Sequence, residues 1–312
     1  MKTQPLHCNP EKGICELPER QNKAITAKND MGKKPVKILY FTDPICSTCW
    51  GTEPQLRKLK LEYGEEFEIA YVMGGLLPDW TYNSGGISKP TDVAAHWDEV
   101  STYYQMPIDG DVWLEDPLHS SYPSSIAFKA AQLQDEVKAI LFLRRIREMV
   151  FLEKINIARW KHLFNAATQV GLDVARFKQD CEGQAKNLFQ SDLDLAAKYG
   201  IRGFPTFLIT GDSNHQRMLE GYKPYSSYES AIMEVYAKVR KRRYKKSWMN
   251  LFDKYKTLTT REFAELSDLS QPQSEAQLEK LTLEGKLSRF ETKNGVLWKL
   301  KMIQINLRIF SE

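Results

Sequence analysis

A pair of cysteines three residues apart constrains this chain more than any other feature. Cys46 and Cys49 lie in TDPICSTCWG, directly after the apolar run VKILYFTD at Val36–Asp43. This run predicts a buried strand, and the residues from near Cys46 through EPQLRKLKLEYG predict a helix that ends at Gly64. FEIAYVMGG, residues 67–75, predicts the next strand. The pair therefore stands at the strand-to-helix junction of a β-α-β unit.

Three interpretations of this pair are open: a redox dithiol, two ligands of a zinc site, or buried thiols without a role. A second C-x-x-C would favour zinc, and the chain has none. The β-α-β context favours redox chemistry. Because a helix N-terminus lowers the pKa of a thiol, we expect Cys46 to be the attacking sulfur and Cys49 the resolving one. We place Ser47, Thr48 and Asp43 around the pair, the two hydroxyls as donors to the thiolate.

A second motif, RGFPTFLI, begins a strand late in the chain. A proline there can simply start the strand. The two motifs together are more specific. DPICSTCWG, VMGGL and GIRGFPTFLI resemble the DsbA-like branch of the thioredoxin superfamily, including the soluble FrnE-like disulfide isomerases, over about residues 36–243. The resemblance implies that Pro205 is a cis-proline beside the dithiol, and that Phe204, Pro205 and Thr206 bind an extended substrate.

Between the two motifs, over about residues 76–200, the pattern is mostly helical. One apolar stripe has helical spacing and leaves three arginines outside it: the stripe is Ala139, Leu143, Ile146 and Val150, and the arginines are Arg144, Arg145 and Arg147. The DsbA-like branch carries such a helical insertion. We therefore expect an α/β thioredoxin domain over residues 36–246, preceded by a flexible tail over residues 1–35 that contains Cys and His.

Past about residue 247 the pattern changes. Two helices are predicted, each starting with a capping box: TTREFAELSDLS with Thr259 and Glu262, and SEAQLEKLTLEGKL with Ser274 and Gln277. SRFETKNGVLWKL then predicts a hairpin that turns at Asn294-Gly295. Residues 247–312, here called the C-terminal module, are thus predicted to form a small winged-helix-like α+β unit.

A further resemblance reaches into this module. DPICSTCWGTEPQLRKLKLEYG, DGDVWLEDPLHSSYPSSIAFKAAQLQ and NGVLWKL are similar to the Spx-degradation adaptor family, SpxH or YjbH, which has the same DsbA-like fold. That family delivers a transcription regulator to the ClpXP protease, and its N-terminus is rich in His and Cys. A regulator protein and ClpXP are the partners that this resemblance implies.

Two functions follow, and the first is the one that the sequence favours. The first is a thiol-disulfide oxidoreductase or isomerase that acts on protein substrates through Cys46 and Cys49 and requires no cofactor. The second is a non-catalytic, redox-sensitive adaptor for ClpXP. A glutathione-dependent transferase on the same fold would require a glutathione pocket, and the sequence has no motif for one.

The other three cysteines do not form a C-x-x-C motif. His7, Cys8 and Cys15 in LHCNPEKGIC predict three ligands of a Zn site, a second regulatory thiol pair, or a tail whose cysteines have no role. No fourth zinc ligand is evident. Cys181, in FKQDCEGQ, has no neighbouring cysteine and is predicted to be a buried, inert thiol.

Charge and hydropathy argue against two classes of partner, nucleic acids and membranes. Lys238–Lys246 holds seven basic residues in nine, which we place at a helix end, where cations are favourable. The candidate recognition helix, residues 274–286, has three glutamates against two lysines, a net charge of −1, which argues against nucleic-acid binding. No apolar stretch is long enough to span a membrane, and the polar N-terminus lacks a signal-peptide core, so we expect a cytoplasmic protein.

Overall fold

The computed structural model describes residues 8–9, 14–16, 34–81, 87–212 and 215–301, and for residues 8–9 and 14–16 it describes the backbone alone. The strands are β1 Cys8–Asn9, β2 Ile14–Glu16, β3 Val36–Thr42, β4 Phe67–Met73, β5 Gly203–Phe204, β6 Thr206–Thr210, β7 Gln216–Glu220, β8 Thr257–Thr259, β9 Leu287–Thr292 and β10 Gly295–Leu300. The helices are α1 Ser47–Gly51, α2 Glu53–Tyr63, α3 Pro90–Tyr104, α4 Val112–Glu115, α5 Tyr122–Gln134, α6 Glu136–Phe151, α7 Trp160–Gln169, α8 Val174–Glu182, α9 Gln184–Lys198, α10 Tyr225–Val235, α11 Trp248–Lys254, α12 Thr260–Ser267 and α13 Gln271–Leu283.

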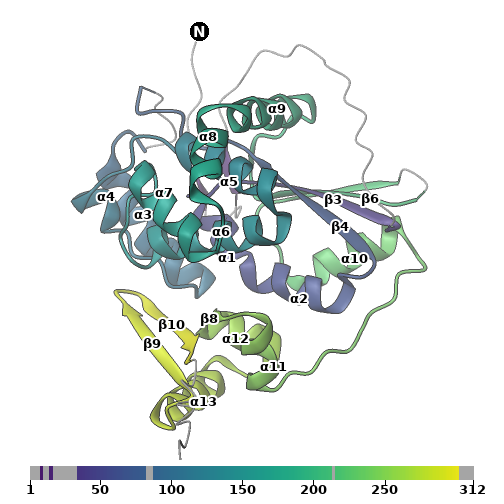
Figure 1. Cartoon of the computed structure of the whole chain (residues 1–312). Helices are drawn as coiled ribbons and strands as arrows, with labels where there is room; N and C mark the ends of the chain where they lie inside the picture. The colour runs from purple at the N-terminus through teal and green to yellow at the C-terminus, as the bar shows by residue number, and fades with distance from the viewer. Residues whose placement is uncertain (1–7, 10–13, 17–33, 82–86, 213–214, 302–312) are drawn as a thin grey trace, which may run out of the picture.

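The central sheet has the strand order β4-β3-β6-β7, with β3 parallel to β4 and antiparallel to β6. Strand β3 lies inside the sheet and is buried along almost its whole length, as its continuous apolar sequence predicts. Figure 1 shows helix α9 on one side of this sheet and helices α2 and α10 on the other. The thioredoxin fold that the sequence predicts is confirmed.

The segment between β4 and β5 is helical, as predicted, and contains α3 through α9. Helix α6 carries the predicted apolar stripe, whose four residues are all buried. The arginines beside the stripe do not all face solvent, however. Arg147 is completely buried, because its guanidinium finds ionic and hydrogen-bond partners inside the fold. Among the described helices, none combines the length and the apolar character that crossing a membrane requires.

The predicted helix after the dithiol is divided in two. Helix α1 ends at Gly51 and α2 begins at Glu53, with Thr52 between them. Pro54 explains the break, because a proline has no N–H to donate to the preceding turn and its ring crowds the carbonyl there. The proline is instead accommodated in the first turn of α2, where no donor is required.

The C-terminal module has the element order α11-β8-α12-α13-β9-β10, with a sheet ordered β8-β10-β9. The capping box of Thr259 and Glu262 is confirmed. The second predicted capping box is wrong, because α13 begins earlier and is capped by Ser270 with Gln273, which leaves Ser274 buried within the helix. Helix α11 and strand β8, each short, were not predicted.

The hairpin of this module turns one residue earlier than predicted. Gly295 is the first residue of β10 and pairs with Thr292, so Lys293 and Asn294 form the turn. The side-chain amide of Asn294 donates to the backbone oxygen of Ile108, 2.7 Å away, which draws the turn toward the helical insertion. Figure 1 shows this hairpin extending from the module toward α3.

The basic segment Lys238–Lys246 was predicted at a helix end, and this is wrong. Helix α10 ends at Val235, and residues 240–246 have no regular secondary structure. Without helical structure, the basic side chains of this segment are spread along the chain, and two of its lysines reach acidic partners. Lys241 Nζ lies 2.7 Å from Glu229 Oε1, and the Lys246 ammonium pairs with the carboxylate of Asp268 on the C-terminal module.

Candidate dithiol site

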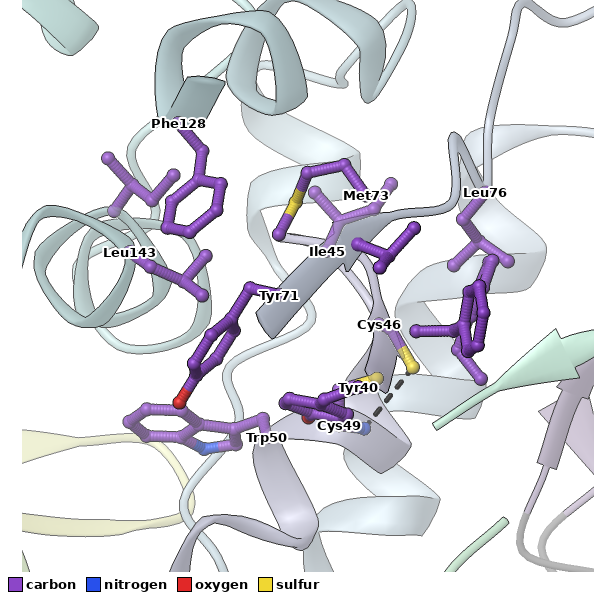
Figure 2. Close-up of a cluster of buried hydrophobic side chains, with 14 of the residues drawn as sticks. Tyr40, Ile45, Cys46, Cys49, Trp50, Tyr71, Met73, Leu76, Phe128 and Leu143 are labelled. Atoms are coloured by element: carbon purple, nitrogen blue, oxygen red, sulfur yellow. Dashed lines mark hydrogen bonds between the residues drawn. The ribbon is translucent and has the colours of Figure 1, made fainter. Parts of the chain in front are cut away.

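The two cysteines lie at the start of α1, where the chain leaves the central strand β3. Cys46 is the N-cap residue, and its Sγ accepts a hydrogen bond from the backbone N–H of Cys49 at 3.2 Å. Figure 2 shows this bond as a dashed line, among buried side chains that include Ile45 and Leu76. Neither cysteine is exposed to solvent. The sequence therefore located the pair correctly at a helix N-terminus but did not indicate its complete burial.

This burial changes the expected thiol pKa values. Burial raises the pKa of Cys46 well above its usual range, and the adjacent Cys49 adds to the effect. Burial also acts against the Cys49 thiolate, but the Cys46 side-chain hydrogen bond and the Arg147 guanidinium outweigh it, so the pKa of Cys49 is lowered. The lower pKa was predicted for Cys46. In this closed geometry the helix N-terminus does not lower the pKa of Cys46, because one N–H bond does not compensate for removal from water; which sulfur attacks stays a prediction.

Asp43 fixes the loop that joins β3 to α1. Its Oδ1 accepts from the Ile45 backbone at 3.0 Å, and its Oδ2 accepts from the Leu76 backbone at 2.8 Å and the Ser121 hydroxyl at 3.0 Å. Burial raises the pKa of Asp43 to about 6, although these hydrogen bonds act in the opposite direction. Asp43 thus ties the dithiol loop to the segment after β4 and to the N-cap residue of α5.

The predicted hydroxyl donors are arranged differently from expectation. The Thr48 hydroxyl lies 3.0 Å from the Tyr104 hydroxyl, and the Ser47 hydroxyl is buried with no hydrogen-bond partner among the described residues. Thr42, at the end of β3, supplies a hydroxyl that lowers the pKa of Cys49. Its position before the C-x-x-C motif gave no signal of this role in the sequence.

Arg147 is the charged group beneath the dithiol. Its Nη2 donates to the Thr42 hydroxyl at 2.6 Å and to the Asp43 backbone oxygen at 3.2 Å, and its Nη1 pairs with Glu53 at 2.6 Å. Burial opposes ionisation of Glu53, but the Arg147 and Arg57 guanidiniums lower its pKa on balance. A fixed positive charge thus faces two thiols from which water is excluded. Sequence reasoning missed this residue, because it lies far from the motif along the chain.

The same ionic cluster continues into the C-terminal module. Arg57, on α2, lies 3.3 Å from Glu262 of α12, and Arg144, on α6, binds both oxygens of Glu262 at 2.7 and 3.0 Å. Glu262 is completely buried. The Arg144 guanidinium also stacks over the ring of Trp50, 4.4 Å from its centroid. The module is therefore joined to the dithiol helix through buried charges.

The predicted substrate-binding residues lie at the junction between β5 and β6, the latter being the strand next to β3. The Phe204-Pro205 peptide bond is cis, and Thr206 pairs with Phe41 in the sheet. This register continues to Pro205 beside Thr42, next to the dithiol loop. The ring of Phe204 is buried against Gly74, where an added Cβ would lie only 1.6 Å from the ring. The backbone of Phe204 is therefore the part available for pairing, and it pairs with Cys15 of strand β2.

Two other cysteine predictions have different outcomes. Cys181, on α8, is buried, and burial raises its pKa to about 12, which agrees with an inert thiol. In the predicted zinc set, His7 lies outside the described residues, and only the backbone of Cys8 and Cys15 is described. Within the part of the chain with described side chains, no three His, Cys, Asp or Glu residues are grouped to hold a metal ion.

Comparisons with known proteins agree with this fold. A family model described as Thioredoxin matches residues 39–230. A putative protein disulfide isomerase from Nitrosomonas europaea is 21% identical, with a TM-score of 0.55, and the match covers 65% of this chain and 96% of that one. A probable DsbA oxidoreductase from Streptomyces coelicolor is 14% identical, with a TM-score of 0.52 over 67% of this chain and 94% of that one. These likenesses show the fold.

Two relatives match over a longer part of the chain. The ClpXP adapter protein SpxH of Halalkalibacterium halodurans is 36% identical over 94% of this chain and 96% of its own length. The ClpXP adapter protein SpxH of Bacillus subtilis is 31% identical over 86% of this chain and 90% of its own length. This protein therefore belongs to the SpxH family of ClpXP adapter proteins, and its fold is that of a DsbA-like thioredoxin domain with an additional C-terminal module.

Proposed function

We propose that this protein is an adaptor that presents a regulator protein to the ClpXP protease, and that its dithiol reports the redox state of its surroundings. The observation that carries this proposal is the extent of similarity. The SpxH relative from H. halodurans aligns with 94% of the chain, whereas the disulfide isomerase structure covers 65% of it. An adaptor for a cytoplasmic protease acts in the cytoplasm.

The geometry of the dithiol supports a sensing role over rapid turnover. Both sulfurs are buried, and an external disulfide reaches a thiol only where that thiol is accessible. The cluster from Arg147 through Glu53 and Arg57 to Glu262 gives the dithiol a contact path to the C-terminal module. A change of charge at Cys49 on oxidation would alter the field on that cluster.

A second candidate function is protein thiol-disulfide exchange. It is favoured by the intact dithiol at the N-terminus of α1 and by the cis-proline on the neighbouring strand. In this function Cys46 would attack a protein disulfide, and Cys49 would resolve the mixed disulfide. Phe204, Pro205 and Thr206 would hold the extended substrate.

Reconstituted proteolysis tests the adaptor function. Purified ClpXP would be given the transcription regulator Spx, with and without this protein, and the regulator's half-life measured. We expect faster degradation in its presence, and we expect the Cys46→Ser/Cys49→Ser variant in reducing buffer to retain that effect. Unchanged degradation with wild-type protein would reject the adaptor function. Glutathione-coupled reduction of a protein disulfide by wild-type protein, absent in the variant, would favour the exchange function instead.

A further inference from the structure

The backbone brings four of the five cysteines to one region of the fold. Strands β1 and β2 form an antiparallel hairpin in which Cys8 is directly opposite Cys15. Strand β2 pairs in turn with β5, and there Cys15 is directly opposite Phe204, the residue before the cis-proline. Cys15 thus holds the register position opposite the residue that precedes Pro205.

The register of the hairpin suits a disulfide. Directly opposed residues of an antiparallel pair have Cα atoms about 4.5–5.5 Å apart. Disulfides bridge Cα separations of about 4.4–6.8 Å. Cys8 and Cys15 therefore lie at a separation that a disulfide spans without a change of backbone conformation.

The register of β6 places the residues that follow β5 beside the end of β3. Thr206 pairs with Phe41, so Pro205 lies beside Thr42, and the chain reaches Cys46 four residues later. Cys46 is completely buried in this arrangement. A thiol from another molecule must first gain access to it, whereas a strand of the same chain is already paired at β5.

We propose that Cys8 and Cys15 form a second redox pair, which exchanges with the Cys46–Cys49 dithiol within the same chain. A low-molecular-weight disulfide first oxidises Cys8 and Cys15 to a Cys8–Cys15 disulfide. This exchange goes beyond the adaptor function and does not depend on it, because neither ClpXP nor a regulator takes part.

The exchange balances in two steps. In the first, Cys46 loses its proton and its Sγ attacks Cys15 Sγ; the Cys8–Cys15 bond breaks, a Cys46–Cys15 bond forms, and Cys8 leaves as a thiolate that takes up a proton. In the second, Cys49 loses its proton and attacks Cys46; the Cys46–Cys15 bond breaks, a Cys46–Cys49 bond forms, and Cys15 leaves as a thiolate that takes up a proton. Two electrons have then passed from Cys46–Cys49 to the hairpin, which ends as two free cysteines.

The rate of dithiol oxidation tests the proposal. The full chain, reduced and freed of metal with a chelator, would be treated with oxidised glutathione, and the Cys46–Cys49 disulfide followed by peptide mass mapping. We expect formation at least about tenfold slower in Cys8→Ser/Cys15→Ser than in wild type, because an intramolecular partner has a high effective concentration. Cys181→Ser, which alters a cysteine outside both pairs, is the matched control. Equal rates in wild type and the double variant would overturn the proposal.

A trapping variant identifies the route. In Cys49→Ala the second step is blocked, and mildly alkaline buffer favours the Cys46 thiolate that the first step requires. We expect a Cys15–Cys46 disulfide to accumulate within one chain and to be absent when Cys15→Ser is added. A Cys8–Cys15 disulfide that persists beside free or glutathionylated Cys46 would refute the transfer. Near-ultraviolet circular dichroism of each variant verifies that the fold is retained.

Discussion

Replacing the buried carboxylate of Glu262 by an amide tests how the C-terminal module is held. Glu262→Gln keeps the size of the side chain and an oxygen able to cap the start of α12, since capping boxes accept glutamine. The change removes the negative charge that faces Arg57 and Arg144. Because Glu262 is completely buried, water does not reach this position. Both guanidiniums therefore lose an ionic partner that water does not replace.

The loss of stability in Glu262→Gln depends on how many ionic partners the two arginines retain. Removing one member of a buried ion pair destabilises a protein by about 3–5 kcal/mol. Arg57 retains Glu53 and Arg144 retains Glu148, so we place Glu262→Gln at the lower end, about 3 kcal/mol. With a urea dependence of about 3 kcal/mol per molar, the unfolding midpoint shifts by about 1 M.

Urea unfolding monitored by tryptophan fluorescence and far-ultraviolet circular dichroism measures this change. The matched control is Glu275→Gln, an exposed glutamate of the same module, which should stay within about 0.5 kcal/mol of wild type. If unfolding has two transitions, the shift belongs to the one that reports on the module. A Glu262→Gln variant as stable as the Glu275→Gln control would refute the structural role given to this cluster.

Three further substitutions act on the dithiol region. The pKa of Asp43 in the folded protein, about 6, exceeds its unfolded value of 3.8. Its contribution to the free energy of unfolding is therefore fully present below pH about 4 and is lost as pH rises through 6. Urea unfolding across pH should show that wild type loses about 3 kcal/mol of stability by pH 7 and that Asp43→Asn does not. Arg147→Met should raise the pKa of Cys49, followed by ultraviolet thiolate absorbance, and an unchanged titration would contradict the charge argument. Gly74→Ala should destabilise the fold by about 1–3 kcal/mol through overlap with Phe204, and unaltered thermal unfolding would show that the ring can move.

Local patterns were sufficient for the elements that carry the dithiol. The apolar run of β3, the glycine after α2 and the Thr259 capping box each depend on neighbours in sequence, and each was predicted. The second capping box failed because Ser270 and Ser274 present similar patterns, and burial of Ser274 by tertiary packing selected Ser270. Short elements such as α11 and β8 leave too few residues for a periodic signal.

The charges around the site were not predictable in the same way. Arg144 and Glu262 are 118 residues apart along the chain, and only the folded arrangement makes them partners. Arg147 lies outside an apolar stripe, a position that usually indicates solvent, yet three polar groups of the dithiol loop and α2 surround it. The thiol pKa values depend on this enclosure, which the motif alone did not indicate.

The attachment of the C-terminal module has a consequence for the connecting segment. The Arg144–Glu262 and Lys58–Asp268 pairs hold the module to the thioredoxin domain by contacts that do not require an intact backbone before it. A protease that cuts among the exposed residues 240–243 would therefore leave two fragments that migrate as one particle in gel filtration. The nicked protein would come apart only in denaturant, so covalent continuity and structural integrity are separate properties of this molecule.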